Sequence, residues 1–332
     1  MAPTHDAFFK AIFRDVRTTA VHVRNTLPPA VVDQLDLEAM VRRPGSFVDE
    51  NLRERHVDLL FEVPFRDGQG RALLYVLFEH QSRSDPIMPL RCLRYMLRIW
   101  DDLLKADENR RTLPPVVPLV LHHSATGWRA PVAFRELLEG PDEVLEALAS
   151  VLPQFRFFLT DLSGMRDEDL RGAALYQVAC LFLKHASEGD LATRLPEWLT
   201  LLAEVASDTT AGLQSLFVVV EYFLRHAPMA VDDFVTTTRH IHPQMQHIIE
   251  STADRLEKAG ELRGIEKGRQ EGRLEGQAKS VVTALEARGM SLTDELRERI
   301  FACRDEAELD RLMKRAIVVG AVTELFADDD EG

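Results

Sequence analysis

The sequence predicts an α/β domain followed by a mainly helical, acidic C-terminal region. Two apolar runs at residues 55–65 and 71–81 flank a glycine-containing turn, which indicates a β-hairpin. A third apolar run, residues 113–123, is continuous rather than alternating, as expected for a strand covered on both faces. Between the second and third runs, residues 86–105 repeat their apolar side chains at helical spacing.

The N-terminal segment predicts two short helices before the first strand. Residues 5–17 carry apolar side chains at helical spacing, and residues 18–27 continue as a second helical stretch that ends before two prolines. The apolar side chains of the first helix are Phe8, Phe9, Ile12 and Phe13. The segment has no apolar signal core and no small-residue cleavage site, so no secretory signal is indicated.

The predicted hairpin ends on polar residues. RHVDLLFEVPF, residues 55–65, is rich in β-branched and aromatic side chains, and Asp67-Gly68 is a strong turn signal. The returning strand contains LLYVLFEHQ and therefore changes from apolar to polar at its end. Strand alternation places Glu79 and Gln81 on one face and the intervening His80 on the other.

Two carboxylates and an amide converge in this prediction. Pairing across the hairpin brings the region of Asp58 opposite the region of Glu79, with Gln81 beside it. Carboxylates on a rigid sheet can hold Mg²⁺, which prefers oxygen ligands, lowers the pKa of a bound water and stabilises charge on a phosphate. The same residues are also explained as surface acids and a solvated amide at the ends of strands. Spacing alone does not decide between the two interpretations.

The pattern of residues 86–105 predicts a helix with an apolar stripe and a basic side. The stripe consists of Leu90, Leu93, Met96, Leu97, Trp100 and Leu104. Arg91, Arg94 and Arg98 fall largely on the other side, where they either follow a phosphate backbone or form an ordinary solvated face. His122 and His123 end the strand that follows. Adjacent residues point to opposite faces, so we expect packing roles for these histidines rather than a shared metal ion.

The C-terminal half is predicted to be helical. Residues 130–250 have the pattern of helices joined by loops, and GIEKGRQEGRLEGQAK then repeats a glycine every fourth residue. Each glycine costs a helix up to about 1 kcal/mol relative to alanine, so we expect a weak helix that orders against a partner. Residues 280–326 are amphipathic again, and the chain ends in an acidic tail.

Composition indicates a globular protein with an uneven distribution of charge. The formal net charge is −14, but residues 1–130 hold 18 Lys and Arg against 17 Asp and Glu, and the remainder holds 22 against 37. A local basic patch for phosphate binding is therefore compatible with the acidic total. The three cysteines form no CxxC pair, and no apolar run is as long as a membrane span. We expect a reduced, cytoplasmic protein without a membrane partner.

Four segments resemble the Rpn family of recombination-promoting nucleases, which includes the YhgA-like group. They are RHVDLLFEV, LLYVLFEHQS, MPLRCLRYMLRIW and LPPVVPLVLHH, and the resemblance extends from about residue 5 to residue 138. EHQS followed by a helix with RxLRYM is its most specific part. The family is similar to the PD-(D/E)XK nucleases, whose core is a mixed sheet flanked by helices, and the resemblance implies that fold here.

The resemblance also implies roles for individual residues. Asp58 matches the metal-binding aspartate, and Glu79 matches the acidic residue of the (D/E)xK element. Gln81 stands where most members of the wider superfamily have lysine, and Asp6 matches an additional acid of the first helix. A glutamine can orient a water through hydrogen bonds, but it has no formal charge with which to stabilise a phosphate intermediate.

The resemblance implies an endonuclease that hydrolyses DNA with Mg²⁺ or another divalent cation and is linked to recombination or mobile elements. Residues 1–140 would form the nuclease core, residues 141–255 a helical extension, and residues 256–332 the glycine-repeat and C-terminal helices. DNA would be the partner, with Arg91, Arg94 and Arg98 along its backbone. Two alternatives stay open: a catalytically weak or inactive DNA-binding accessory protein, which Gln81 favours, and a helical module that forms homo-oligomers through the C-terminal helices.

Overall fold

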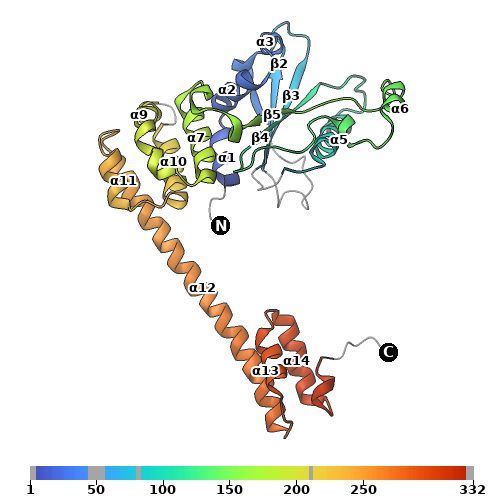
Figure 1. The fold of residues 1–332 in the computed structure, drawn as a ribbon, viewed down its shortest axis with the longest axis vertical. Coiled ribbons are helices and arrows are strands. Elements are labelled where there is room, and N and C mark those ends of the chain that lie inside the picture. The colour runs from blue at the N-terminus through green and yellow to red at the C-terminus, as the bar shows by residue number, and fades with distance from the viewer. Residues whose placement is uncertain (1–4, 44–56, 80–83, 209–211, 327–332) are drawn as a thin grey trace. The chain divides into compact units, whose positions relative to one another are not determined.

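A five-stranded mixed sheet organises the N-terminal part of the chain (Figure 1). The computed structural model describes residues 5–43, 57–79, 84–208 and 212–326. It divides into two compact units, Met1–Ala253 and Asp254–Gly332. The strands are β1 (Val41–Arg43), β2 (Val57–Pro64), β3 (Arg71–Glu79), β4 (Val116–His122) and β5 (Phe158–Asp161), in that order across the sheet.

The predicted hairpin forms the middle of this sheet. β2 and β3 are antiparallel, with Val57 opposite Phe78 at one end and Pro64 opposite Arg71 at the other. Gly68 in the connecting turn has a φ of 72°, a left-handed conformation that glycine adopts without strain. β1 pairs antiparallel with β2, whereas β4 and β5 add parallel to β3. The mixed sheet flanked by helices that the resemblance implied is therefore confirmed.

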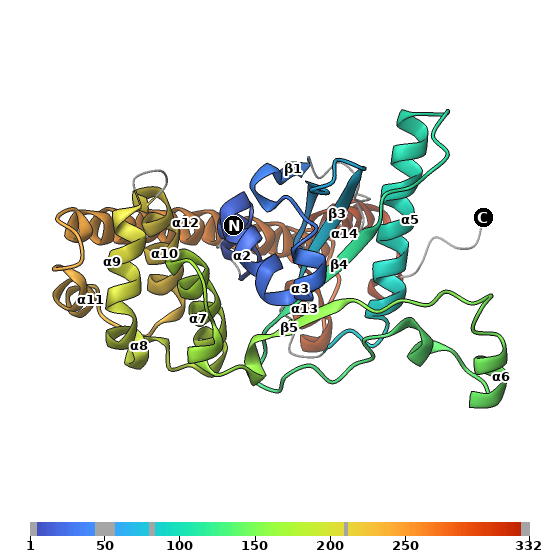
Figure 2. The same ribbon diagram turned by 90° about the horizontal axis from the view of Figure 1, so that it is seen from above.

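The two faces of the sheet are covered by different helices (Figure 2). α5 (Met88–Ala106) covers one face, where Cys92 and Tyr95 pack with Leu60 and Tyr75. The other face is covered by α1 (His5–Phe13) and α2 (Val16–Thr26), and α7 (Ala174–Glu188) packs against these two helices. β4 is buried along nearly its whole length, as the continuous apolar run at residues 113–123 predicted.

The predicted apolar stripe of α5 is not the line of side chains that the helix buries. Leu97 and Leu104 of the predicted stripe are 50% and 40% exposed. The buried side chains of the helix are instead Met88, Pro89, Arg91, Cys92, Tyr95 and Ile99. The apolar side of this helix is wide, so periodicity does not identify which line within it contacts the sheet. Tyr95 does so, with its ring 4.8 Å from that of Tyr75.

Helices complete the first unit, together with β5, which, like β1, was not predicted from the sequence. The remaining helices here are α3 (Pro29–Val32), α6 (Asp142–Ala147), α8 (Leu191–Arg194), α9 (Leu199–Ser207), α10 (Gly212–His226) and α11 (Val231–Thr238). β5 lies within residues 130–250, which were predicted to be entirely helix and loop. Its four residues extend the sheet past residue 140, the predicted end of the nuclease core.

The glycine repeat lies within one continuous helix, α12 (Met245–Ala287). The start of α12 packs into the first unit through Met245, Ile248 and Ile249. Its later residues pack with α13 (Asp294–Ala302) and α14 (Glu306–Val318) around the small apolar core of the second unit. Among the helices that the structure describes, none is long and apolar enough to cross a membrane.

Candidate active site at the end of the sheet

The backbone register relates the two candidate carboxylates. Asp58 pairs with Leu77 across the hairpin, and Glu79 lies two residues beyond Leu77 on the same strand. Opposite residues of an antiparallel pair share a face, as do residues two apart on one strand, so positions 58 and 79 are diagonal neighbours on one face. Such neighbours lie roughly 7 Å apart. The side chains of Asp58 and Glu79, and all of His80 and Gln81, lie outside what the structure describes.

Two further polar residues continue this row across the sheet. His122 pairs with Glu79 in the parallel β3–β4 register, and Asp161 pairs with His122 in the β4–β5 register. The row thus runs through the ends of neighbouring strands, from position 58 to position 161. The sequence does not reveal this row, because it contains no clear signal for β5 and does not show which strands lie beside His122.

The described members of the row hold the surrounding loop in place. His122 is fully buried, its Nε2 lies 3.1 Å from the Ser124 hydroxyl, and its ring packs edge-on against Trp128. The Asp161 carboxylate accepts hydrogen bonds from the backbone N–H of Trp128 at 2.7 Å and of Ser163 at 3.2 Å. These contacts anchor the loop after β4 against the end of β5, beside the candidate site.

The three candidate DNA-binding arginines have different environments. Arg91 is only 8% exposed, and its Nη1 lies 3.2 Å from the Asp85 carboxylate. Arg94 is exposed and Arg98 is half-buried. The interpretation as an ordinary solvated face is therefore wrong for Arg91, which is among the buried residues of α5 together with Tyr95. Contact of these arginines with DNA stays a prediction.

Asp6 is held at the same end of the sheet by the first turn of α1. Its neighbour His5 contacts the ring of His123, which directly follows β4, at 4.8 Å between centroids. The Nδ1 of His5 and the Tyr222 hydroxyl form a hydrogen bond of 2.6 Å. α1, however, packs on the sheet face opposite to the one that positions 58 and 79 occupy by alternation. A metal ion shared with those positions would therefore require Asp6 to reach around the strand ends, and its metal-binding role stays a prediction.

A second group of titratable side chains lies at the end of α7. His185 Nδ1 is 2.8 Å from Asp190 and 3.1 Å from Glu188, and this trio has the spacing of a metal site. On its other side, His185 Nε2 is 2.9 Å from Asp167, which also pairs with Lys184 and Arg194. The network joins α7 and α8 to the preceding loop, and opposite charges within it compensate one another. We interpret it as structural.

Comparisons with known proteins identify relatives along most of the first unit. The family described as "Putative transposase, YhgA-like" matches residues 3–212. The recombination-promoting nuclease RpnD of Escherichia coli O157:H7 is 33% identical over 210 residues, which cover 62% of this chain and 76% of the relative. RpnA of Escherichia coli K12 is 27% identical over 260 residues, which cover 77% and 84%.

Some relatives carry a different description. RpnE of Escherichia coli K12, called an inactive recombination-promoting nuclease-like protein, is 26% identical over 268 residues, which cover 80% of this chain and 86% of the relative. No solved structure matches the chain. The match to the family extends from the first helix to the end of α9 and includes all strands of the described sheet. The chain belongs to the Rpn family of YhgA-like transposases and recombination-promoting nucleases.

Proposed function

We propose that the first unit is a DNA endonuclease that depends on a divalent cation. The observation that carries this proposal is the β2–β3 register, which sets positions 58 and 79 as diagonal neighbours on one sheet face. Two carboxylates at that separation repel each other in a low-dielectric environment unless a proton or a cation lies between them. Oxygen ligands on paired strands suit Mg²⁺, which binds few protein ligands and keeps several waters. The relatives described as nucleases support the same chemistry.

Each residue has a separate role in the proposed reaction. Asp58 and Glu79 would hold the cation, with Asp6 as a supporting acid from α1. When bound, the cation would activate water and neutralise charge on the scissile phosphate. Gln81 would orient the attacking water through its amide, because its neutral side chain cannot stabilise the phosphate charge as a lysine would. His122, paired with the Glu79 position, would keep the loop after β4 from moving relative to the site.

Nicking of supercoiled plasmid tests the proposal. The parent protein is expected to nick with Mg²⁺ and to stop when EDTA is added, and Asp58→Ala and Glu79→Ala should each lose activity by at least about a hundredfold. Glu143→Ala removes an exposed carboxylate of α6 and serves as the matched control. Cleavage by Asp58→Ala at the parent rate would exclude this site.

A catalytically weak or inactive DNA-binding protein is the second candidate. Gln81 in place of lysine favours it, as does the relative RpnE that is described as inactive. Salt-dependent binding of duplex DNA by a well-folded parent protein that never nicks, under Mg²⁺, Mn²⁺ and Ca²⁺ in turn, would identify this case.

A helical interaction module is the third candidate. Leu262 and Ile265 of α12 are 68% and 61% exposed beside the glycine repeat, which favours self-association through this helix. Sedimentation of the full chain over a range of protein concentrations distinguishes this candidate. A monomer at every concentration would exclude self-association.

A further inference from the structure

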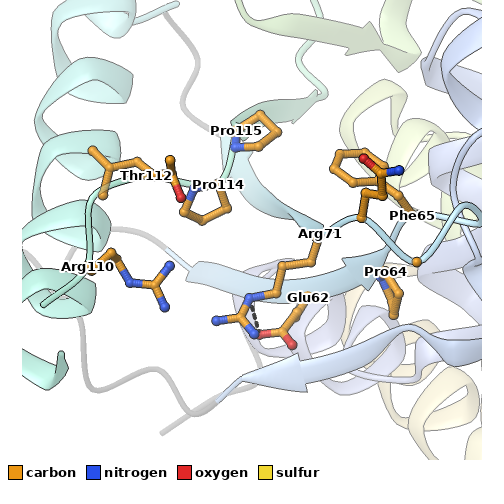
Figure 3. A pocket seen from close by; sticks show the side chains of 12 residues that line it. Glu62, Pro64, Phe65, Arg71, Arg110, Thr112, Pro114 and Pro115 are labelled. Atoms are coloured by element: carbon orange, nitrogen blue, oxygen red, sulfur yellow. Dashed lines mark ion pairs between the residues drawn. The ribbon is translucent and has the colours of Figure 1, made fainter.

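A polar cleft lies at the end of the hairpin opposite to the candidate active site (Figure 3). The β2–β3 turn forms one wall and the loop after α5 forms the other, and the cavity between them measures about 620 Å³. This volume lies within the range of small-molecule binding sites. Position 58 and the cleft residue Pro64 are six residues apart on β2, which corresponds to about 20 Å at the usual rise of a strand. The cleft is therefore separate from the carboxylate pair.

The side chains in this cleft carry an excess of positive charge. Glu62, whose side chain is 14% exposed, accepts a hydrogen bond from Arg43 Nε at 2.9 Å and also pairs with Arg71 Nε at 3.3 Å. The Glu62 carboxylate thus forms ion pairs with two guanidinium groups, and one positive charge of this trio is not compensated. Arg110 adds a second positive charge from the opposite wall, and its guanidinium and that of Arg71 point into the cleft (Figure 3).

Arg110 is the strongest indication of a ligand. Its Nε is buried, and among the residues that the structure describes it has no hydrogen-bond partner. A buried donor without a partner is destabilising, because its hydration is lost and nothing replaces it. The described residues also supply no ion pair to this guanidinium. An anionic oxygen bound in the cleft would satisfy both its charge and its Nε–H.

The geometry points to a phosphate group, and we propose that this cleft binds the phosphate of a nucleotide. Guanidinium groups bind phosphate oxygens through paired N–H donors, and Arg71 and Arg110 approach the cavity from two sides. Phe65, Pro114 and Pro115 supply apolar wall beside these cations, where a sugar or base would lie. The inference that the cleft binds a phosphate group is independent of the proposed function. The inference that this phosphate belongs to DNA rests on the proposed function. A strand bound there would be held several nucleotides away from the bond that is cut.

Binding of oligonucleotides without catalysis tests the inference. The full-length chain with Glu79→Ala is titrated in EDTA with fluorescent single-stranded and duplex DNA at several salt concentrations, and anisotropy gives the Kd. The double variant, with Arg110→Gln combined with Glu79→Ala, is expected to bind DNA about tenfold more weakly. Its slope of log K against log salt should be smaller by about 1, as for loss of one phosphate contact. Its thermal unfolding midpoint should not fall, because the guanidinium it loses has no described partner.

Arg111→Gln is the matched control. It makes the same change at the next residue, which is exposed, lies outside the cleft lining and donates to the carbonyls of Glu108 and Arg110. It should leave both the Kd and the salt slope nearly unchanged. Equal effects of the two variants, or no effect of Arg110→Gln on any ligand, would overturn the inference.

A parallel thermal-shift titration identifies the source of the phosphate. In one outcome, inorganic phosphate or deoxyadenosine monophosphate stabilises the parent but not Arg110→Gln, while both proteins bind DNA with the same affinity. The site then takes a free nucleotide, and DNA is excluded as its ligand. The binding experiment uses neither metal nor cleavage. A failure of the proposed endonuclease would appear only in the nicking assay, whereas a failure of the cleft would leave nicking intact.

Discussion

Acidification is expected to destabilise the first unit through His22, a fully buried histidine of α2. Its Nδ1 lies 3.4 Å from the Thr26 hydroxyl and 3.5 Å from that of Tyr176, and its ring packs edge-on against Phe13. Burial lowers the pKa of His22 from 6.5 to about 4 because the charged imidazolium loses its hydration. The unfolded chain therefore binds a proton at this residue at a higher pH than the native protein does.

The sign and size of the effect follow from this difference. Because the pKa is lower in the folded state, the contribution of His22 is fully present above pH 6.5 and is lost as the pH falls toward 4. A difference of roughly 2.5 pH units corresponds to about 3 kcal/mol of unfolding free energy in total. Between about pH 7.5 and about pH 5.0 the loss should reach roughly 2 kcal/mol.

Tryptophan fluorescence during urea unfolding isolates the unit in question. All three tryptophans, Trp100, Trp128 and Trp198, belong to Met1–Ala253. His22→Gln should lower stability at neutral pH but should lose about 2 kcal/mol less than the parent on acidification, since an amide does not titrate in this range. His247→Gln, at an exposed position on α12, should follow the parent at every pH. If His22→Gln and the parent lose stability in parallel, His22 is not held neutral in the native protein.

Two further predictions concern the stability of the same unit. Burial alone would raise the pKa of Asp167, but hydrogen bonds from Lys184 and His185 hold this pKa below its ordinary value. Asp167 therefore contributes stability that is present above its unfolded pKa. This contribution is lost as the pH falls through the lower folded pKa. Asp167→Asn should therefore cost about 3 kcal/mol near neutral pH and progressively less in acid, and a constant cost in urea titrations across pH would contradict this account. Gly172 has a φ of 127°, and an added Cβ would lie 2.3 Å from Val21 Cγ1. Gly172→Ala should lower the unfolding free energy by about 3 kcal/mol. Gly189→Ala, at a φ of 80° with open space among the described atoms, should lower it by only about 1 kcal/mol. Equal costs of the two substitutions would show that Val21 moves aside freely.

The sequence predicts the parts of the fold whose signals are local. The β2–β3 hairpin follows from its turn, where Gly68 adopts a positive φ, and β4 follows from its unbroken apolar run. β5 has only four residues and no alternation of buried and exposed positions. It is held by its register with β4 and by a 3.0 Å hydrogen bond between the hydroxyls of Thr160 and Thr26. Both partners are distant in sequence, so no window around β5 contains the information that makes it a strand.

The candidate site also has parts that the sequence predicts and parts that it does not. The hairpin signals were enough to predict that the region of position 58 lies opposite the region of position 79, and the register pairs position 58 with position 77, two residues from position 79. The placement of His122 beside position 79 depends on which strand is added next to β3, and this is a tertiary property. Arg91 shows the limit of helical periodicity, because a buried ion pair with Asp85 lets a charged residue occupy the line that faces the sheet.

The polar row at the end of the sheet needs an explanation that folding alone does not supply. Leu73 and Tyr75 of β3 face one core and Leu74 and Val76 face the other, so this strand is built to be buried on both faces. A polar group buried in a core is unfavourable unless it is hydrogen-bonded or charge-compensated. The two described members, His122 and Asp161, are compensated by Ser124 and by backbone N–H groups. In the proposed site, two neighbouring carboxylates at positions 58 and 79 would repel each other, and a bound cation would turn this repulsion into binding energy. Under the proposed function, the carboxylate pair would be unfavourable for folding by itself and would become favourable when a cation is bound, as expected of residues kept for chemistry rather than for stability.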